Sequence, residues 1–351
     1  MDFALNNEQQ MLHESARRFF ADHHPLSRAR KALPFSDPAS QKLWKDMAEM
    51  GWMALLAPEA MDGLGLGLTE AYLVAEAAGN QLLNQPWASS AVLLPLWVKA
   101  AQENAPEGLK TLLQGILNGE RAAHCVDEQD RLWDFAAQCT DTVVVRGLNV
   151  EVKAKDESQP LQIAIAPSVS AAHATPGLDP TLTQSPAAVE PASLQWHTLE
   201  LSTADREHAR SAYRLMQCAE LVGVAQSALA LGAAYAIERA QFGKPIGSYQ
   251  AIKHQLANAW MAVDNARLAA LYASAALDGR LPDAAFASAA AEFTAIEGAL
   301  QTTRTVIQVH GGMGFTWEHD AHLYLKRAQH LAARLGGASR VLSRVEALAL
   351  A

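Results

Sequence analysis

The sequence predicts a mainly α-helical protein with a small β domain in its middle and a bundle of long helices at its C-terminal end. Apolar residues recur at helical spacing over residues 1 to 120, which predicts an N-terminal helical domain. Short β-branched or alternating runs take over in residues 121 to 204, and alanine-rich helical patterns return in residues 205 to 351. No repeat of fixed period is visible, so we expect the three segments to pack as one subunit.

The composition excludes several classes of protein. Of 351 residues, 50% are hydrophobic and 19% charged, so the chain is neither a disordered tail nor a fibre. A formal net charge of -9 without a Lys/Arg-dense run argues against a nucleic-acid partner. Cys125, Cys139 and Cys218 lack the spacing of a disulfide framework or zinc site. With no signal-peptide pattern and no apolar run of 18 residues, we expect a soluble cytoplasmic protein without membrane insertion.

Local signals place the N-terminal helices. Asn6 and Gln9 have the spacing of a capping box before an amphipathic helix. A second helix is predicted around residues 43 to 50. A third is predicted over 69 to 78 and is expected to end before Gly79, because glycine is a common helix stop.

The middle domain is predicted from short runs with strand character. We expect strands over residues 142 to 145, 149 to 153, 161 to 166 and 194 to 201. Residues 168 to 193 are rich in Pro, Ala, Ser and Thr and are predicted to be mainly loop.

The C-terminal segment is predicted to form an antiparallel bundle of four long helices. Their approximate ranges are residues 205 to 236, 248 to 278, 282 to 309 and 319 to 349.

The first candidate binding motif lies between two of these helices. Arg239 offers a fork of donors suited to a pyrophosphate, Phe242 a flat apolar surface, and Gln250 an amide at the next helix start. An ordinary interhelical turn with a solvated arginine has the same pattern, so the spacing alone leaves both interpretations open.

The second candidate motif follows the third bundle helix. Gln308 precedes His310, Gly311 and Gly312, and glycines there would let the backbone approach a ligand closely. A GGxG sequence alone is a weak signal, because glycines commonly end helices. Histidines also gather nearby, including an i, i+3 pair, but no pattern of carboxylate or cysteine ligands accompanies them, so no metal site is predicted.

Taken together with three N-terminal motifs, these segments resemble the acyl-CoA dehydrogenase family. The N-terminal motifs are residues 43 to 52, 57 to 59 and the glycine-rich loop 62 to 67. The loop follows no predicted strand, so it is interpreted as structural and not as a phosphate cradle. The resemblance covers about residues 1 to 120 and 205 to 345. It implies an N-terminal helical domain, a middle β domain and a C-terminal four-helix bundle.

The resemblance also implies FAD. In that family the matching residues of the two motifs reach across a subunit interface to the neighbouring subunit's FAD. The positions carried over here are Arg239, Phe242, Gln250, Gln308, Gly311 and Gly312.

This sequence departs from the family where the catalytic base is expected. The family removes the α-proton of an acyl-CoA with a glutamate while a hydride leaves to the flavin. The two positions that carry the glutamate are occupied here by Leu335 and Tyr213, neither of which is a useful base. Glu220 lies two helical turns, about 10 Å, beyond Tyr213 and is a weak substitute. Arg214 matches a residue near the family's acyl-CoA pocket, but an arginine at a surface or interface fits the pattern equally well.

The middle domain has also diverged from the family. Residues 126 to 130 replace the family's Thr-Glu-Pro-Gly segment, and no Trp-Ile-Thr-like motif follows, so the half of the site around the flavin ring is not recognisable. Heteromeric family members that act on CoA esters of steroids and other bulky acids resemble this pattern. We therefore expect a non-catalytic or half-site subunit that completes the FAD site of a homologue carrying the glutamate, in an α2β2 assembly. We also expect an acyl-CoA substrate and an electron-transfer flavoprotein or similar acceptor.

Two other interpretations remain open from the sequence. The chain could be a self-sufficient dehydrogenase with a displaced base, such as Glu220 or Glu128. It could also be a scaffold or regulatory homologue that kept the fold without FAD.

Overall fold

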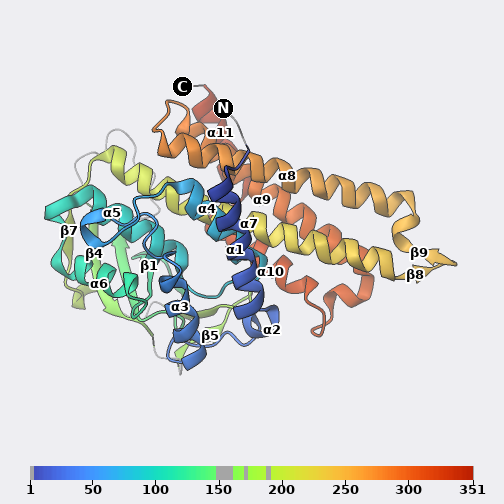
Figure 1. Ribbon diagram of the computed structural model, residues 1–351, viewed down its shortest axis with the longest axis horizontal. Coiled ribbons are helices and arrows are strands. Elements are labelled where there is room, and N and C mark those ends of the chain that lie inside the picture. Colours follow the sequence, from blue (N-terminus) through green and yellow to red (C-terminus); the bar gives the residue numbers. More distant parts are fainter. Residues whose placement is uncertain (1–3, 148–160, 170–172, 187–190, 351) are drawn as a thin grey trace. The chain divides into compact units, whose positions relative to one another are not determined.

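The computed structural model describes residues 4–147, 161–169, 173–186 and 191–350 (Figure 1). Helices come first along the chain, strands follow, and long helices close it, as the sequence predicts. The chain divides into two compact units. One comprises Met1–Ser27, Tyr72–Leu83 and Arg214–Ala351, and the other comprises Arg28–Ala71 and Asn84–Tyr213. Because these units do not follow chain order, the three predicted domain boundaries stay a prediction.

The N-terminal helices begin at the capping box that the sequence predicts. The Asn6 side chain accepts from the Gln9 N–H at 2.8 Å, and the Gln9 side chain accepts from the Asn6 N–H at 3.1 Å. Each bond satisfies a backbone donor that has no partner within the first helical turn. The helices of this part are α1 (Asn7–His23), α2 (Leu26–Ala29), α3 (Pro38–Glu49), α4 (Leu68–Asn80), the π-helical η2 (Ser89–Leu93), α5 (Leu94–Ala101) and α6 (Glu107–Leu117).

The β region contains two small sheets. In the first, β1 (Ala123–Asp127) pairs in parallel with β3 (Asp141–Arg146), which pairs antiparallel with β4 (Leu161–Pro167), followed by β7 (His197–Leu199). The second has the order β2 (Leu132–Asp134), β6 (Thr183–Pro186), β5 (Thr175–Pro176).

The predictions for this region were partly right. The strands at 142 to 145 and 161 to 166 are confirmed, the last strand is shorter than predicted, and the segment 149 to 153 lies outside the described residues. β1 was missed because all five of its residues are buried, including His124 and Asp127, so it shows no apolar alternation. Trp133 on the unpredicted β2 packs with Val126 and Val144 in the core.

The first three C-terminal helices follow the predicted ranges to within about two residues at each end, and the fourth is interrupted. Helix α9 packs against α8, α10 and α11 (Figure 1). The prediction of one helix over 319 to 349 is wrong, because Gly336 and Gly337 adopt φ values of +95° and +79° that break it. The elements are α7 (Thr203–Glu238), β8 (Ala240–Gln241), β9 (Lys244–Pro245), α8 (Gln250–Asp278), α9 (Ala284–His310), η7 (Gly311–Phe315), α10 (Ala321–Arg334) and α11 (Ala338–Ala349).

Helices α4 and α7 touch through their backbones. A Cβ atom on Gly79 would lie 2.3 Å from the Glu220 carbonyl oxygen, and one on Gly223 would lie 2.0 Å from the Glu76 carbonyl oxygen. The prediction that Gly79 ends α4 is therefore wrong. The glycine lies inside the helix because α7 leaves no room for a side chain.

The crossing surrounds a fully buried carboxylate, Glu76. Its oxygens lie 3.0 Å from Nε2 of His13 on α1, 3.1 Å from Nε of Arg267 on α8 and 3.2 Å from Nε2 of Gln226 on α7. Burial raises the pKa of the Glu76 carboxyl, but the His13 hydrogen bond and the Arg267 charge together bring it below its ordinary value. One ionised group therefore connects four helices.

Helix α7 is the one described helix that is long and apolar enough to cross a membrane by length and composition. A helix with an apolar face in a protein core passes the same test, and 44% of the apolar window of α7 is buried.

We expect Gly223→Ala to lower the free energy of unfolding by about 3 kcal/mol or more, because the added methyl group would force α4 and α7 apart. Gly108→Ala in α6 is the matched control. Its Cβ would meet Ile165 Cδ1 at 3.7 Å, an ordinary contact, so stability should stay equal or rise by up to about 1 kcal/mol. Thermal and urea unfolding measure both, and equal stability of the two variants would contradict the close crossing.

Candidate functional site

The fold brings the two predicted binding motifs to one end of the helical bundle. Tyr235 on α7 stacks on His310, the last residue of α9, with ring centroids 4.3 Å apart. The Tyr235 hydroxyl also donates to Sδ of Met313 at 3.8 Å. We refer to residues 235–250 and 308–317 as the bundle tip.

The first half of the bundle tip is a small hairpin, β8–β9 (Figure 1). The Ile246 N–H donates to the Arg239 carbonyl at 2.8 Å, and the Tyr249 hydroxyl donates to the Gln241 carbonyl at 3.1 Å. The Lys244 ammonium lies 4.3 Å from the centre of the Tyr249 ring. Phe242, at the turn, has φ +53° and is 92% exposed, so its ring is turned outward from the chain.

The predicted cofactor residues share one property, which is exposure at this tip. A Cβ atom added to Gly311 or Gly312 would meet no other atom within 4 Å, so the backbone there is open to a close-approaching ligand. An arginine fork, an outward aromatic ring, two amides and uncovered glycine backbone fit the pyrophosphate-bearing part of a dinucleotide. The exposed residues are Arg239, Phe242, Gln250, Gln308, Gly311 and Gly312.

The two positions expected to carry the base are buried to different degrees. Leu335, which follows the last residue of α10, is 1% exposed. Tyr213 is half-buried on α7. The Leu335 carbonyl accepts a hydrogen bond of 2.7 Å from Nη2 of Arg214.

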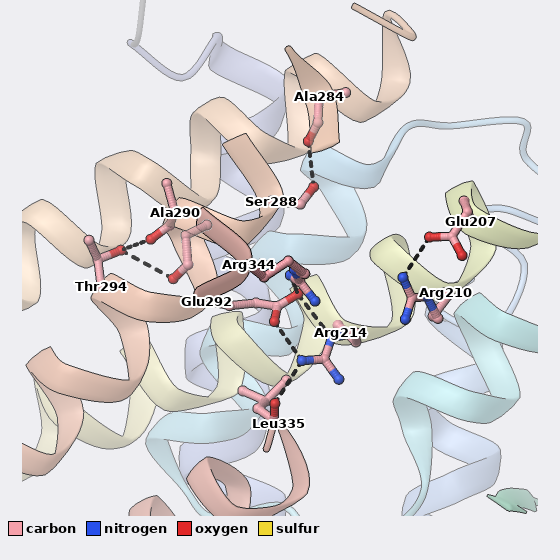
Figure 2. Close-up of polar contacts among 11 residues, drawn as sticks. Glu207, Arg210, Arg214, Ala284, Ser288, Ala290, Glu292, Thr294, Leu335 and Arg344 are labelled. Atoms are coloured by element: carbon pink, nitrogen blue, oxygen red, sulfur yellow. Dashed lines mark hydrogen bonds and ion pairs between the residues drawn. The ribbon is translucent and has the colours of Figure 1, made fainter. Parts of the chain in front are cut away.

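Beside Leu335 lies a buried carboxylate that the sequence analysis missed, Glu292 on α9. Figure 2 shows it between Arg214 and Arg344. Oε1 of Glu292 accepts from Nε of Arg214 at 2.9 Å and lies 2.6 Å from Nη2 of Arg344. Its Oε2 accepts from Nη2 of Arg214 at 2.6 Å. We call these three residues the Glu292 cluster.

The cluster changes the interpretation of Arg214. This residue was a candidate for contact with an acyl-CoA, and the structure places its donors on Glu292 and on the Leu335 carbonyl. The signal that could have revealed the cluster is the position of Glu292 in an alanine-rich helix, on the same face as Ala295 and Ala299. A charge on a buried helix face needs a partner.

The two candidate substitute bases are engaged in ion pairs. Glu220 on α7 pairs with Arg327, a fully buried arginine whose Nη1 also donates to the Leu83 carbonyl at 3.0 Å. Glu128 lies 2.8 Å from Nε of Arg146 at the edge of the first sheet.

The histidines near the tip make ring contacts. His310 and His319 have centroids 4.3 Å apart, and His322 stacks on Trp317. Across the described residues, no group of three His, Cys, Asp or Glu side chains is arranged to hold a metal ion.

Comparison with known proteins places both ends of the chain. Residues 6–105 match the model of the acyl-CoA dehydrogenase N-terminal domain, and residues 210–349 match that of the acyl-CoA dehydrogenase C-terminal domain. The chain is 30% identical over 352 residues to acyl-CoA dehydrogenase IpdE2 of Mycobacterium tuberculosis, with 97% of this chain and 96% of that protein covered.

Solved structures with the same fold include assemblies of two different proteins. The Tcur3481-Tcur3483 steroid ACAD G363A variant has a TM-score of 0.76 at 23% identity, with 98% of each chain covered. The ChsE4-ChsE5 complex from Mycobacterium tuberculosis has a TM-score of 0.76 at 21% identity, covering 99% of this chain and 98% of that one. Flavoproteins solved with FAD also share the fold, at TM-scores of 0.77 and 0.76.

We expect Glu292→Gln to lower the free energy of unfolding by about 3–5 kcal/mol, because two guanidinium groups would lose the buried charge that compensates them. Glu297→Gln, on an exposed position of the same helix, is the matched control and should change stability by less than about 0.5 kcal/mol. Urea unfolding at neutral pH compares them, and a similar small effect for both would show that the cluster is not structural.

Proposed function

The chain belongs to the acyl-CoA dehydrogenase family, and from that premise we propose that it is a subunit that completes the FAD site of a homologous partner without abstracting the substrate proton itself. One asymmetry carries the proposal. The residues suited to the pyrophosphate end of FAD are exposed together at the bundle tip, while the two base positions hold the buried Leu335 and the half-buried Tyr213.

The reaction we assign to the assembly is α,β-dehydrogenation of an acyl-CoA thioester, in which bound FAD supplies the hydride acceptor. This chain's part is binding and orientation. The Arg239 guanidinium can donate two parallel hydrogen bonds to a phosphate, and the amides of Gln250 and Gln308 can donate to further acceptors. The open backbone at Gly311 allows close approach. The partner supplies the glutamate and the pocket for the flavin ring.

Solvent-exposed apolar side chains support the proposal of a partner subunit. Large hydrophobic residues are exposed at the bundle tip and on the first half of α8, and exposed apolar patches on a monomer commonly mark an interaction surface. Their exposed fractions run from 48% to 92%, and they are Ile237, Phe242, Trp260, Met261, Met313, Phe315 and Trp317. A homologous partner related by a local twofold axis would cover them, and two such pairs give an α2β2 tetramer.

For the substrate we propose a CoA ester of a bulky, steroid-derived acid. The support is the fold shared with the Tcur3481-Tcur3483 steroid ACAD and the ChsE4-ChsE5 complex. An electron-transfer flavoprotein or similar protein would reoxidise the flavin, and the cytoplasm is the compartment we assign.

The first test is flavin content and assembly mass, measured on the chain purified alone and after co-expression with a candidate homologue that carries the glutamate. We expect a colourless protein alone and a yellow complex with one FAD per pair of unlike chains. If the chain alone holds stoichiometric FAD and oxidises an acyl-CoA, it is a self-sufficient enzyme and the proposal is wrong. If no partner confers flavin, the chain is a scaffold.

The second test replaces the arginine of the hairpin. In the co-purified complex, Arg239→Ala should weaken FAD binding roughly 10- to 100-fold, which corresponds to the loss of about 1.5–3 kcal/mol from charged hydrogen bonds. Arg239→Lys should restore only part of the affinity, because a single ammonium cannot form the two parallel bonds. Lys253→Ala, another exposed cation near this end, is the control. Equal FAD retention in all variants by fluorescence titration would remove Arg239 from the site.

A further inference from the structure

The base position of this chain is a filled junction. Leu335 and Glu292 are each 1% exposed, so solvent scarcely reaches either side chain. Four elements meet there: α7 contributes Arg214, α9 contributes Glu292, α11 contributes Arg344, and Leu335 follows the last residue of α10. A thioester could not place its α-carbon beside Leu335 in this arrangement.

The nearest carboxylate is also unsuited to proton transfer. Three nitrogen atoms of two guanidinium groups lie 2.6–2.9 Å from the Glu292 oxygens. Such charge-assisted bonds occupy the lone pairs that would have to receive a proton. At the Glu292 cluster, the surroundings of Leu335 are closed to solvent and the nearest carboxylate is paired with two arginines.

Arg344 has a particular role because it comes from the C-terminal helix. Val341 is the single buried residue among the twelve of α11, all of which the structure describes. The ion pair of Arg344 with Glu292 is therefore a main attachment of α11 to the bundle, next to the Gly336–Gly337 turn that begins it.

We propose that Arg344 holds α11 down on the Glu292 cluster and thereby keeps position 335 closed, so that this chain excludes an acyl-CoA thioester from its own base position. The proposal rests on the proposed function and deepens it. In this chain the glutamate is missing at position 335 and the surroundings of that position are closed. Each pair of unlike chains would then bind the acyl-CoA thioester at the partner's base alone. A glutamate restored at 335 would enter a packed core and not a pocket.

Thiol accessibility tests the closure directly. The three native cysteines are buried and free. Burial raises the pKa of the Cys139 thiol to about 12 and raises the pKa values of the Cys125 and Cys218 thiols as well. The folded chain should therefore react very slowly with 5,5′-dithiobis(2-nitrobenzoate), and a cysteine added by substitution can be followed alone.

We expect the thiol of Leu335→Cys to react at least about 100-fold more slowly than that of Ser339→Cys, an exposed position at the start of α11. Adding Arg344→Met to Leu335→Cys should raise the rate about tenfold or more by releasing α11. Adding Arg340→Met, an exposed arginine one turn earlier, should leave the rate unchanged. Rapid reaction of Leu335→Cys, or no acceleration by Arg344→Met, would overturn the proposal.

If the substitution unfolds the chain, all four thiols of the variant will react and not only the introduced one. The closure of position 335 is then tested by hydrogen exchange of the unsubstituted chain. The Leu335 and Gly336 N–H groups donate to the Leu331 and Ala333 carbonyls at 2.9 and 3.0 Å, so a closed junction predicts slow exchange there. Exchange at the rate of an unfolded peptide would overturn it.

The two proposals can fail separately. If the thiol at position 335 reacts rapidly while the heteromeric complex is yellow, the proposed closure is wrong and the proposal of a shared FAD site stands. Slow reaction in a chain that acquires flavin with no partner would leave the closure standing and end the proposed function.

Discussion

The direct backbone contact of α4 with α7 is the constraint on which the helical unit depends. Gly79 and Gly223 leave no space between the two helices, and this fixes what the neighbouring side chains can reach. Asn80 donates to the Gly223 carbonyl at 2.8 Å, and Glu76 meets its partners from three other helices. Glu220 is committed at the same crossing through Arg327. A carboxylate that looks like a spare base in the sequence is part of the framework.

Much of the fold follows from local chemistry, and the departures have identifiable causes. The Asn6 capping box and the long bundle helices were predicted because they depend on neighbours in sequence. The end of α4 was misjudged because glycine serves both as a helix stop and as a place of close approach, and only the distant α7 distinguishes them. Strand β1 was missed because its polar residues are buried by partners that a local pattern does not contain.

The candidate site divides in the same way. Resemblance to a family located the exposed residues of the bundle tip, and the fold explains their grouping through Tyr235, which contacts both His310 and Met313. The position of Glu292 on a buried helix face signals that it needs a partner, but its partners could not be identified from the sequence, because Arg214 and Arg344 lie on α7 and α11 and no spacing relates them to Glu292 on α9. Family resemblance showed that position 335 lacks the acid. The structure showed that the Glu292 cluster packs beside Leu335 at that position.

The hairpin that carries Phe242 is held in shape by its own contacts. The Tyr249 ring supports the Lys244 ammonium from one side and meets the Phe242 ring edge-on, with centroids 6.5 Å apart. Since the strained backbone of Phe242 is set before any other molecule arrives, little conformational entropy remains to be lost on association. In the pairing proposed above, a partner subunit would therefore meet a surface whose shape is already set, and relatives that do not match that shape would dissociate faster. The rigidity of the hairpin would then favour one pairing among homologous dehydrogenases over the others.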